Sequence, residues 1–167
     1  MFSLEIEGLA RKVIDTFTQK KKKIVTAESC TGGLIAAILT TVPGSSAVLE
    51  RGFISYSNEA KVDLLGVPPD MIDMKGAVSA EVATAMAQGA LEYSLADVAV
   101  SVTGIAGPGG GTPEKPVGLV YFGLATKDGV AMHYKCEFTG DRRSIRAQSV
   151  HEALRLLLSL DDKDIKF

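Results

Sequence analysis

Short apolar runs that alternate with amphipathic segments are the feature that most constrains how this chain folds. A run such as Val98–Val102 has the length and composition of a single buried strand. Between the runs, apolar side chains recur at spacings of three and four residues, as Leu9, Val13 and Phe17 do. This spacing predicts helices that bury one face. The chain is therefore expected to enclose a sheet between helices.

The order of the predicted elements selects a fold class. The predicted strands are Ile24–Ala27, Ala47–Ser57, Val98–Val102, Val117–Thr126 and Val130–Phe138. The predicted helices are Leu4–Lys22, Leu34–Thr40, Asn58–Leu65, a segment that begins after Ser79, and Asp141–Leu160. Helices and strands alternate early, and Lys127–Gly129 then makes a hairpin turn before a covering helix. This order predicts an α/β fold, a three-layer α/β/α sandwich around a mixed sheet. We expect a single domain over residues 1–167, with a charged tail, 161–167, that frays.

Charge and apolar run length exclude several kinds of partner. The 167 residues carry a net charge of −2, which argues against a nucleic-acid partner. The basic run Lys20–Lys23 is predicted to end a helix, where its charges complement the helix dipole. No apolar run could span a bilayer, and the acidic start lacks the features of a signal peptide, so we expect a cytoplasmic protein without a membrane partner. Cys30 and Cys136 would then be free thiols.

Familiar catalytic and metal-binding motifs are missing from the sequence. It has no Walker loop, no dinucleotide fingerprint and no G-x-S-x-G nucleophile elbow. His133 and His151 lack the spacing of metal ligands, and the two cysteines are isolated from each other. We therefore predict no metal site.

The turn around Ser29, between a predicted strand and a predicted helix, is the first candidate for chemistry. Serine before a helix is commonly an N-cap, and that explanation stays open. Gly32 and Gly33 weaken helix propensity in the first turn, which makes sense if the backbone N–H groups of residues 30–33 face a ligand. Such donors beside a hydroxyl would form an oxyanion hole.

A serine nucleophile needs a base, and the histidines offer no obvious triad. Lys61 follows the end of an aromatic strand, where burial would lower its pKa and let it accept a proton. Taken singly, such a lysine is more often a solvated helix residue, and a tyrosine like Tyr56 is more often a packing residue of the strand. A cysteine nucleophile at Cys30 is a weaker alternative, because the sequence places no cationic or histidine partner beside it.

The glycine-rich stretch Thr103–Gly118 leaves a buried strand and must form a loop. Glycine permits close approach of the backbone to a ligand and exposes N–H groups, so the loop could line a site for an anion or a flat polar ligand. A plain surface connection between two strands is the alternative.

Four motifs in order give the chain a specific resemblance. They are AESCTGG at Ala27–Gly33, YSNEAK at Tyr56–Lys61, GAVS at Gly76–Ser79 and TGIAGPGGG at Thr103–Gly111. Together they resemble the CinA C-terminal domain family, over about Leu4 to Leu160. The resemblance is to family members without the large N-terminal molybdopterin-binding-like domain. It implies a nicotinamide-nucleotide amidase, which hydrolyses nicotinamide mononucleotide to nicotinate mononucleotide and ammonia without a metal or organic cofactor.

The resemblance also implies roles for individual residues. Ser29 would be the nucleophile, Lys61 the general base, and Tyr56 a residue that assists proton movement or orientation. Arg142 matches a substrate-binding arginine, with Arg143 as a less certain neighbour, whereas Arg146 is expected to be solvated. The residues expected to bind substrate are Cys30, Thr31, Gly32, Gly33, Thr103, Gly104, Gly107, Gly109 and Arg142.

Two further expectations concern function as a whole. The resemblance and the alanine-rich helix faces suggest a homo-oligomer. The family's competence-related name suggests a role with DNA, for which the acidic charge balance gives no electrostatic support. The functional alternative is a non-catalytic nucleotide-binding module, which would follow if Lys61 were solvated.

Overall fold

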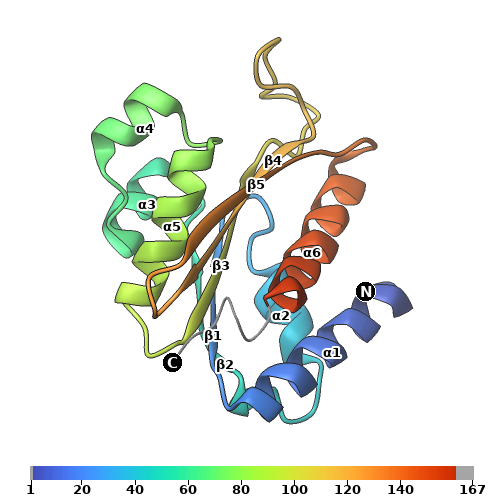
Figure 1. Ribbon diagram of the computed structural model, residues 1–167. Helices are drawn as coiled ribbons and strands as arrows, with labels where there is room; N and C mark the ends of the chain where they lie inside the picture. Colours follow the sequence, from blue (N-terminus) through green and yellow to red (C-terminus); the bar gives the residue numbers. More distant parts are fainter. Residues whose placement is uncertain (1, 161–167) are drawn as a thin grey trace.

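A five-stranded sheet forms the middle layer of the molecule (Figure 1). The computed structural model describes residues 2–160, so the predicted tail 161–167 lies outside the described part. The strands are β1 (Ile24–Glu28), β2 (Leu49–Ile54), β3 (Val98–Gly104), β4 (Leu119–Thr126) and β5 (Ala131–Glu137), in the spatial order β2-β1-β3-β4-β5. β1 pairs in parallel with β2 and β3, whereas β4 pairs antiparallel with β3 and β5. The sheet is therefore mixed, as predicted.

Helices cover both faces of this sheet (Figure 1). The helices are α1 (Leu4–Lys20), α2 (Leu34–Thr40), α3 (Asn58–Leu65), α4 (Pro69–Lys75), α5 (Ala80–Glu92) and α6 (Arg142–Ser159), with a short 3-10 turn, η1, at Ser45–Ala47. Figure 1 shows α1, α2 and α6 on one side of the sheet and α3, α4 and α5 on the other. Each side has its own apolar core cluster. The three-layer α/β/α prediction is confirmed.

The alanine-rich face of α5 has a different use from the one predicted. Ala83, Ala87 and Ala90 are fully buried, and α5 packs against β3 and β4 within the same chain. Small side chains let the helix lie close to the sheet. That face is consumed inside the molecule and gives no support for oligomerisation.

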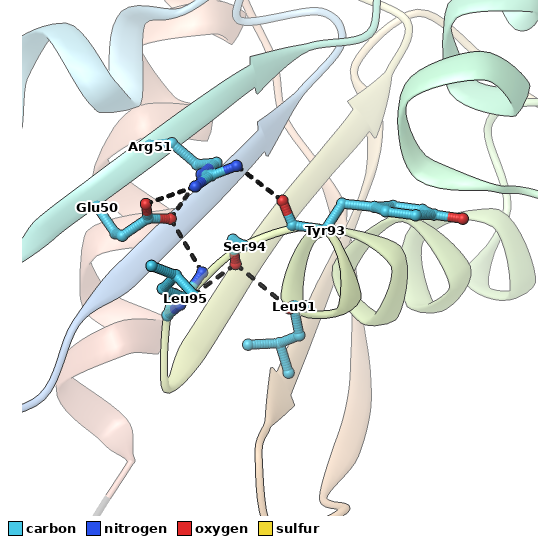
Figure 2. A network of polar contacts seen from close by, with 7 residues as sticks. Glu50, Arg51, Leu91, Tyr93, Ser94 and Leu95 are labelled. Atoms are coloured by element: carbon cyan, nitrogen blue, oxygen red, sulfur yellow. Dashed lines mark hydrogen bonds and ion pairs between the residues drawn. The ribbon is translucent and has the colours of Figure 1, made fainter.

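A polar network joins edge strand β2 to the segment that follows α5 (Figure 2). Arg51 binds Glu50 at 2.7 Å through Nε and donates through Nη1 to the carbonyl oxygen of Tyr93 at 2.9 Å. Glu50 in turn accepts the backbone N–H of Leu95 at 3.2 Å. The contact with Arg51 lowers the pKa of the Glu50 carboxyl. These bonds tie edge strand β2 to the turn after α5, and β2 leads directly to the segment that carries Tyr56 and Lys61.

The structure departs most from the predicted elements at two places. The chain forms helix α4 from Pro69, and this helix is not among the predicted ones. Proline at the first helical position is favourable because no backbone N–H is needed there. β2 ends at Ile54, three residues before the predicted end, because the hydroxyl of Ser57 caps α3 through the N–H of Ala60. Among residues 2–160, no helix has both the length and the apolar character to cross a membrane.

Candidate active site

The site lies where three parallel strands end. β1, β2 and β3 run in the same direction, with Glu28 level with Ile54 and with Val102. The residues that follow β1 and β2, and the last residues of β3, therefore meet at one edge of the sheet, as expected for α/β folds. Residues at or after these three strand ends line a cavity of about 210 Å³, among them Ser29, Tyr56, Asn58, Lys61 and Thr103.

Ser29 and Lys61 are in direct contact. The Nζ atom of Lys61 lies 3.0 Å from the Oγ atom of Ser29, although the residues are 32 apart in sequence. The same Nζ donates to the carbonyl oxygens of Ser55 at 3.0 Å and Tyr56 at 3.1 Å, while the carbonyl of Ser57 is more distant, at 3.5 Å. A protonated Lys61 would donate its three N–H bonds to Ser29 Oγ and to the two close carbonyls. A neutral Lys61 can keep its two N–H bonds on the carbonyls and turn its lone pair towards the Ser29 hydroxyl.

Burial favours the neutral form of the Lys61 amine. The side chain is only 1% exposed, and no carboxylate within residues 2–160 pairs with it. Removal from water lowers the pKa of Lys61 below its ordinary value. The sequence left a solvated lysine open, and the structure decides for the buried one. A lysine in this state can accept a proton from a neighbouring hydroxyl.

Glu28 organises the turn that carries Ser29. Its buried carboxylate accepts hydrogen bonds from the Thr31 hydroxyl at 2.6 Å and from the N–H groups of Gly33 at 3.0 Å, Ile35 at 3.1 Å and Ala36 at 2.9 Å. It therefore satisfies the donors at the start of α2, a role for which Ser29 was one candidate. Sequence reasoning missed this function of Glu28. The residue ends an apolar strand, and a carboxylate just before a helix was a usable signal.

The amides of the turn divide into used and open groups. Gly32 donates its N–H to the carbonyl of Ser29 and Gly33 donates to Glu28, so both amides are occupied. Within residues 2–160, the N–H groups of Cys30 and Thr31 donate to no carbonyl or carboxylate, although the Cys30 N–H lies near its own Sγ. Gly32 and Gly33 have φ angles of 59° and 100°, a backbone conformation that favours glycine. The two glycines are thus explained by the shape of the turn, and the open donors are Cys30 and Thr31.

Tyr56 contributes its backbone and its ring to different parts of the site. Its carbonyl oxygen lies near both Lys61 Nζ and Ser29 Oγ, the latter at 3.5 Å. Its phenol points elsewhere and accepts a hydrogen bond from Arg142 Nη2 at 3.1 Å. The ring makes no hydrogen bond to Ser29 or Lys61, so the structure links Tyr56 to the pair through its carbonyl.

The glycine-rich loop approaches the site with its first half only. Thr103 is buried at the cavity and donates its hydroxyl to the carbonyl of Ala77 at 2.9 Å, and Gly104 lines the same cavity. The carbonyl of Gly107 accepts a hydrogen bond from Arg142 Nη1 at 2.9 Å. Gly109 is exposed and lines neither cavity at the site. Figure 1 shows the rest of the loop extending away from the sheet.

A second, larger cleft of about 630 Å³ adjoins the cavity at Ser29. The two share Ala106 and Arg142. Arg142, Arg143 and Arg146 all line the cleft from the first turns of α6, where the positive end of the helix dipole also lies. The combined site therefore has a small polar end with a buried amine and a wide end suited to an anion.

The expectation that Arg146 is solvated is wrong, because its guanidinium binds the backbone of the turn after Ser29. Its Nε donates to the carbonyl of Cys30 at 3.1 Å and its Nη2 donates to the carbonyl of Thr31 at 3.2 Å. The contact joins residues more than a hundred positions apart, so helix spacing gave no signal for it. Arg142 and Arg143, by comparison, are exposed at the start of α6.

The Cys30 thiol is poorly suited to nucleophilic chemistry. Burial raises its pKa to about 11, partly offset by its own backbone N–H, so the reactive thiolate is scarce near neutral pH. Within residues 2–160, no group of three or more His, Cys, Asp or Glu side chains could hold a metal ion.

Comparison with known proteins places the chain in a family. The model of the CinA C-terminal domain matches residues 6–160. A nicotinamide-nucleotide amidohydrolase PncC of Shigella flexneri is 45% identical over 157 residues, which cover 94% of this chain and 95% of that protein. A putative competence-damage inducible protein of Caldicellulosiruptor bescii is 54% identical over 94% of this chain, but this chain spans only 38% of its length.

Solved structures agree with this relationship. A competence/damage inducible protein from Agrobacterium tumefaciens superposes with a TM-score of 0.93 at 49% identity, covering 95% of this chain and 97% of that one. A CinA superfamily protein from Escherichia coli gives a TM-score of 0.88 at 35% identity, covering 92% and 88%. By sequence and by fold, the chain belongs to the CinA C-terminal domain family.

Proposed function

We propose that this chain hydrolyses the carboxamide of nicotinamide mononucleotide, giving nicotinate mononucleotide and ammonia. The observation that carries the proposal is the contact between Ser29 Oγ and the buried Nζ of Lys61 at 3.0 Å. A serine beside a desolvated amine, with open backbone N–H groups nearby, is an arrangement suited to acyl transfer. The relatives named nicotinamide-nucleotide amidohydrolase, at 45% and 53% identity, support the choice of substrate.

In the first half of the proposed reaction, Ser29 Oγ attacks the carboxamide carbon while neutral Lys61 takes the hydroxyl proton. The N–H groups of Cys30 and Thr31 stabilise the oxyanion of the tetrahedral intermediate. Lys61 then gives its proton to the departing nitrogen, the C–N bond breaks, and ammonia leaves. The nicotinoyl group remains as an ester on Ser29, and Lys61 is neutral again.

In the second half, water attacks the ester carbon and Lys61 takes a proton from that water. The second tetrahedral intermediate collapses, Lys61 returns the proton to Ser29 Oγ, and the carboxylic acid is released. The carbonyls of Ser55 and Tyr56 hold the amine in place through both steps. One amine therefore serves as base and acid in turn, and no cofactor enters the balance.

The proposed substrate would lie across both hollows of the site. Its carboxamide would occupy the cavity of about 210 Å³ at Ser29, with Thr103 and Gly104 in the wall. Its phosphate would occupy the cleft of about 630 Å³, where Arg142 and Arg143 offer forked donors. In this arrangement the ring of Tyr56 positions Arg142 for the phosphate.

Ammonia release from nicotinamide mononucleotide tests the proposal. We expect turnover by the wild-type chain and a loss of at least roughly 10⁴-fold in Ser29→Ala. Lys61→Ala should lose roughly 10²–10⁴-fold, because the base is removed and the nucleophile stays. Binding of the nucleotide without ammonia release, unaffected by Lys61→Ala, would instead establish the non-catalytic binding module. That alternative required a solvated Lys61, and the buried position of Lys61 favours the enzyme.

We also propose that the reaction takes place in the cytoplasm. Two unpaired cysteines suit a reducing compartment.

We further propose that the chain acts as a homo-oligomer. Exposed apolar side chains on and beside edge strand β2, among them Ile54 and Leu95, offer a surface for self-association. Sedimentation velocity should give a multiple of the 17.6 kDa chain mass, and a monomer at micromolar concentration would refute the association.

A further inference from the structure

We propose that Arg146 is a positioning residue that, together with Glu28, holds the turn of the nucleophile in its reactive shape. The inference rests on the proposed function in one respect only, namely that Ser29 is the nucleophile. In this role Arg146 would help to stabilise the transition state by holding the turn, and would not bind the substrate anion.

The contacts of Arg146 are directed at the backbone of the turn. Nε and Nη2 lie on one edge of the planar guanidinium, and they donate to two consecutive carbonyls, those of Cys30 and Thr31. A rigid fork can satisfy two acceptors in a fixed relative orientation, whereas the ammonium of lysine acts as a single point charge. Arg146 thus fixes the orientation of two peptide groups at once.

Glu28 binds the same turn with a negative charge, as Arg146 does with a positive one. It is 1% exposed and accepts the Thr31 hydroxyl and the N–H groups of Gly33, Ile35 and Ala36. A buried carboxylate with this many donors is strongly constrained. The N–H groups of Gly33, Ile35 and Ala36 are therefore bound to a carboxylate, whereas that of Leu34 donates to the Thr31 carbonyl. The Cys30 carbonyl binds the guanidinium of Arg146, and the Thr31 carbonyl accepts from both Arg146 and Leu34.

These bonds determine where the open amides point. In a planar trans peptide the N–H points opposite to the C=O. The Ser29 carbonyl is bonded to the N–H of Gly32, which sets the direction of the Cys30 N–H. The Cys30 carbonyl is bonded to Arg146, which directs the Thr31 N–H away from the guanidinium. Among residues 2–160, Arg146 is the one hydrogen-bond donor to the Cys30 carbonyl, so without it this peptide group could rotate.

The neighbouring arginines make a matched contrast. Arg142 binds the Gly107 carbonyl and the Tyr56 hydroxyl at the mouth of the cleft, and Arg143 is exposed along it. Within residues 2–160, neither makes a hydrogen bond to the turn at residues 29–33. Loss of Arg142 should therefore weaken substrate binding, whereas loss of Arg146 should slow the chemical step.

The test measures kcat and KM for nicotinamide mononucleotide in Arg146→Ala and Arg146→Lys. We expect kcat to fall roughly 10²-fold, the size of effect seen when an oxyanion donor is lost, with KM within about threefold of wild type. Millimolar guanidinium chloride should restore part of the kcat of Arg146→Ala. Arg155→Ala, on the same helix and bound to Glu152 on the surface, is the matched control and should retain wild-type kinetics. A rise in KM with kcat unchanged would show that Arg146 binds the anion, and would overturn the inference.

A second readout is independent of the natural substrate. Phenylmethanesulfonyl fluoride reacts with an activated serine as the oxygen displaces fluoride from sulfur, and intact mass reports the product. Labelling of Ser29 should slow at least roughly tenfold in Arg146→Ala and remain unchanged in Arg155→Ala. If the wild type is labelled but releases no ammonia, the substrate proposal fails while this inference stands. If the wild type neither turns over nor is labelled, Ser29 is not the nucleophile and the inference fails as well. Equal labelling in Arg146→Ala and wild type would also contradict it.

Discussion

At the scale of single residues, the burial of Lys61 favours its action as a base but lowers the stability of the folded chain. An amine removed from water resists protonation, and this is the property that a general base needs. The carbonyls of Ser55 and Tyr56 orient it without supplying a negative charge that would restore its ordinary pKa. The same desolvation opposes folding whenever the unfolded chain holds Lys61 as a solvated ammonium.

The pH dependence of turnover follows from the direction of this pKa shift. Lys61 must be neutral to accept the Ser29 proton, so kcat/KM should rise with pH through a single ionisation that lies below the ordinary lysine value of about 10.4. Stopped-time ammonia assays from pH 5 to 10 measure this profile. A flat profile over that range, in a protein whose fold is intact by circular dichroism, would argue against Lys61 as the base.

Replacing the amine should separate activity from stability. Lys61→Met keeps a long apolar stem and removes the desolvated group, so we expect no turnover and a free energy of unfolding higher by roughly 1 kcal/mol at pH 7. Because the folded-state pKa is lowered, the wild type gains stability as pH rises between that value and the unfolded-state value. The advantage of Lys61→Met should therefore shrink towards pH 10. Urea unfolding at both pH values measures it, and a less stable Lys61→Met at pH 7 would contradict the argument.

Cys30 provides a prediction about reactivity. With a thiol pKa of about 11, the folded protein should react very slowly with iodoacetamide at this position at pH 7.5. Unfolding in urea should make alkylation fast, and peptide mass mapping locates the product. Rapid alkylation of Cys30 in the native protein would reopen the cysteine-nucleophile alternative.

The residues that the sequence identified and those it missed differ in a physical way. Ser29 and Lys61 belong to motifs whose residue types indicate a nucleophile and a base, and in the structure the two side chains are in contact. Arg146 and Glu28 work through backbone atoms of a turn, and a carbonyl acceptor leaves no trace in the identity of the residue that carries it. For the same reason, only the structure distinguished the open amides of Cys30 and Thr31 from those in use.

At the scale of elements, the position of α3 depends on its contact with α5. A Cβ atom at Gly89 in α5 would lie 1.8 Å from the carbonyl oxygen of Leu65, one turn beyond Lys61 in α3. A backbone atom cannot move away without a large cost in energy, so α3 and α5 can approach this closely only because residue 89 has no side chain. The start of α5 after Ser79 was predicted, and its small residues favour close packing. Only the structure identifies the Leu65 carbonyl as the group that approaches Gly89.

Gly89→Ala should therefore disturb both fold and activity. We expect a loss of about 1–3 kcal/mol in unfolding free energy from overpacking, and a lower kcat as α3 shifts Lys61 relative to Ser29. Gly8→Ala is the matched control, since a Cβ there meets nothing within 4 Å and alanine favours the helix by roughly 0.5–1 kcal/mol. Thermal unfolding and ammonia assays on both variants measure the contrast. Equal stability of the two variants would show that the α3–α5 contact is not limiting.

At the scale of the whole molecule, the site joins both helical layers through the sheet edge. α3 on one side supplies Lys61, and α6 on the other supplies the arginines. A ligand that spans the two hollows should therefore stabilise the entire fold. In Ser29→Ala, nicotinamide mononucleotide at a hundredfold excess over its Kd should add about 2.7 kcal/mol to the unfolding free energy, read as a rise in Tm. Arg142→Ala in the same background should reduce the rise, and an unchanged Tm in both would contradict the proposed placement of the substrate.

The change from parallel to antiparallel pairing at β3 has a practical consequence for the molecule. With β4 antiparallel to β3, and β5 antiparallel to β4, the chain returns to the carboxyl edge of the central strands twice, once as the glycine-rich loop and once at the start of α6. The turn at Lys127–Gly129 lies at the other end of these strands. An inserted tag or reporter domain at that turn would sit a full strand length from Ser29, so it offers a site for attachment that leaves the chemistry undisturbed.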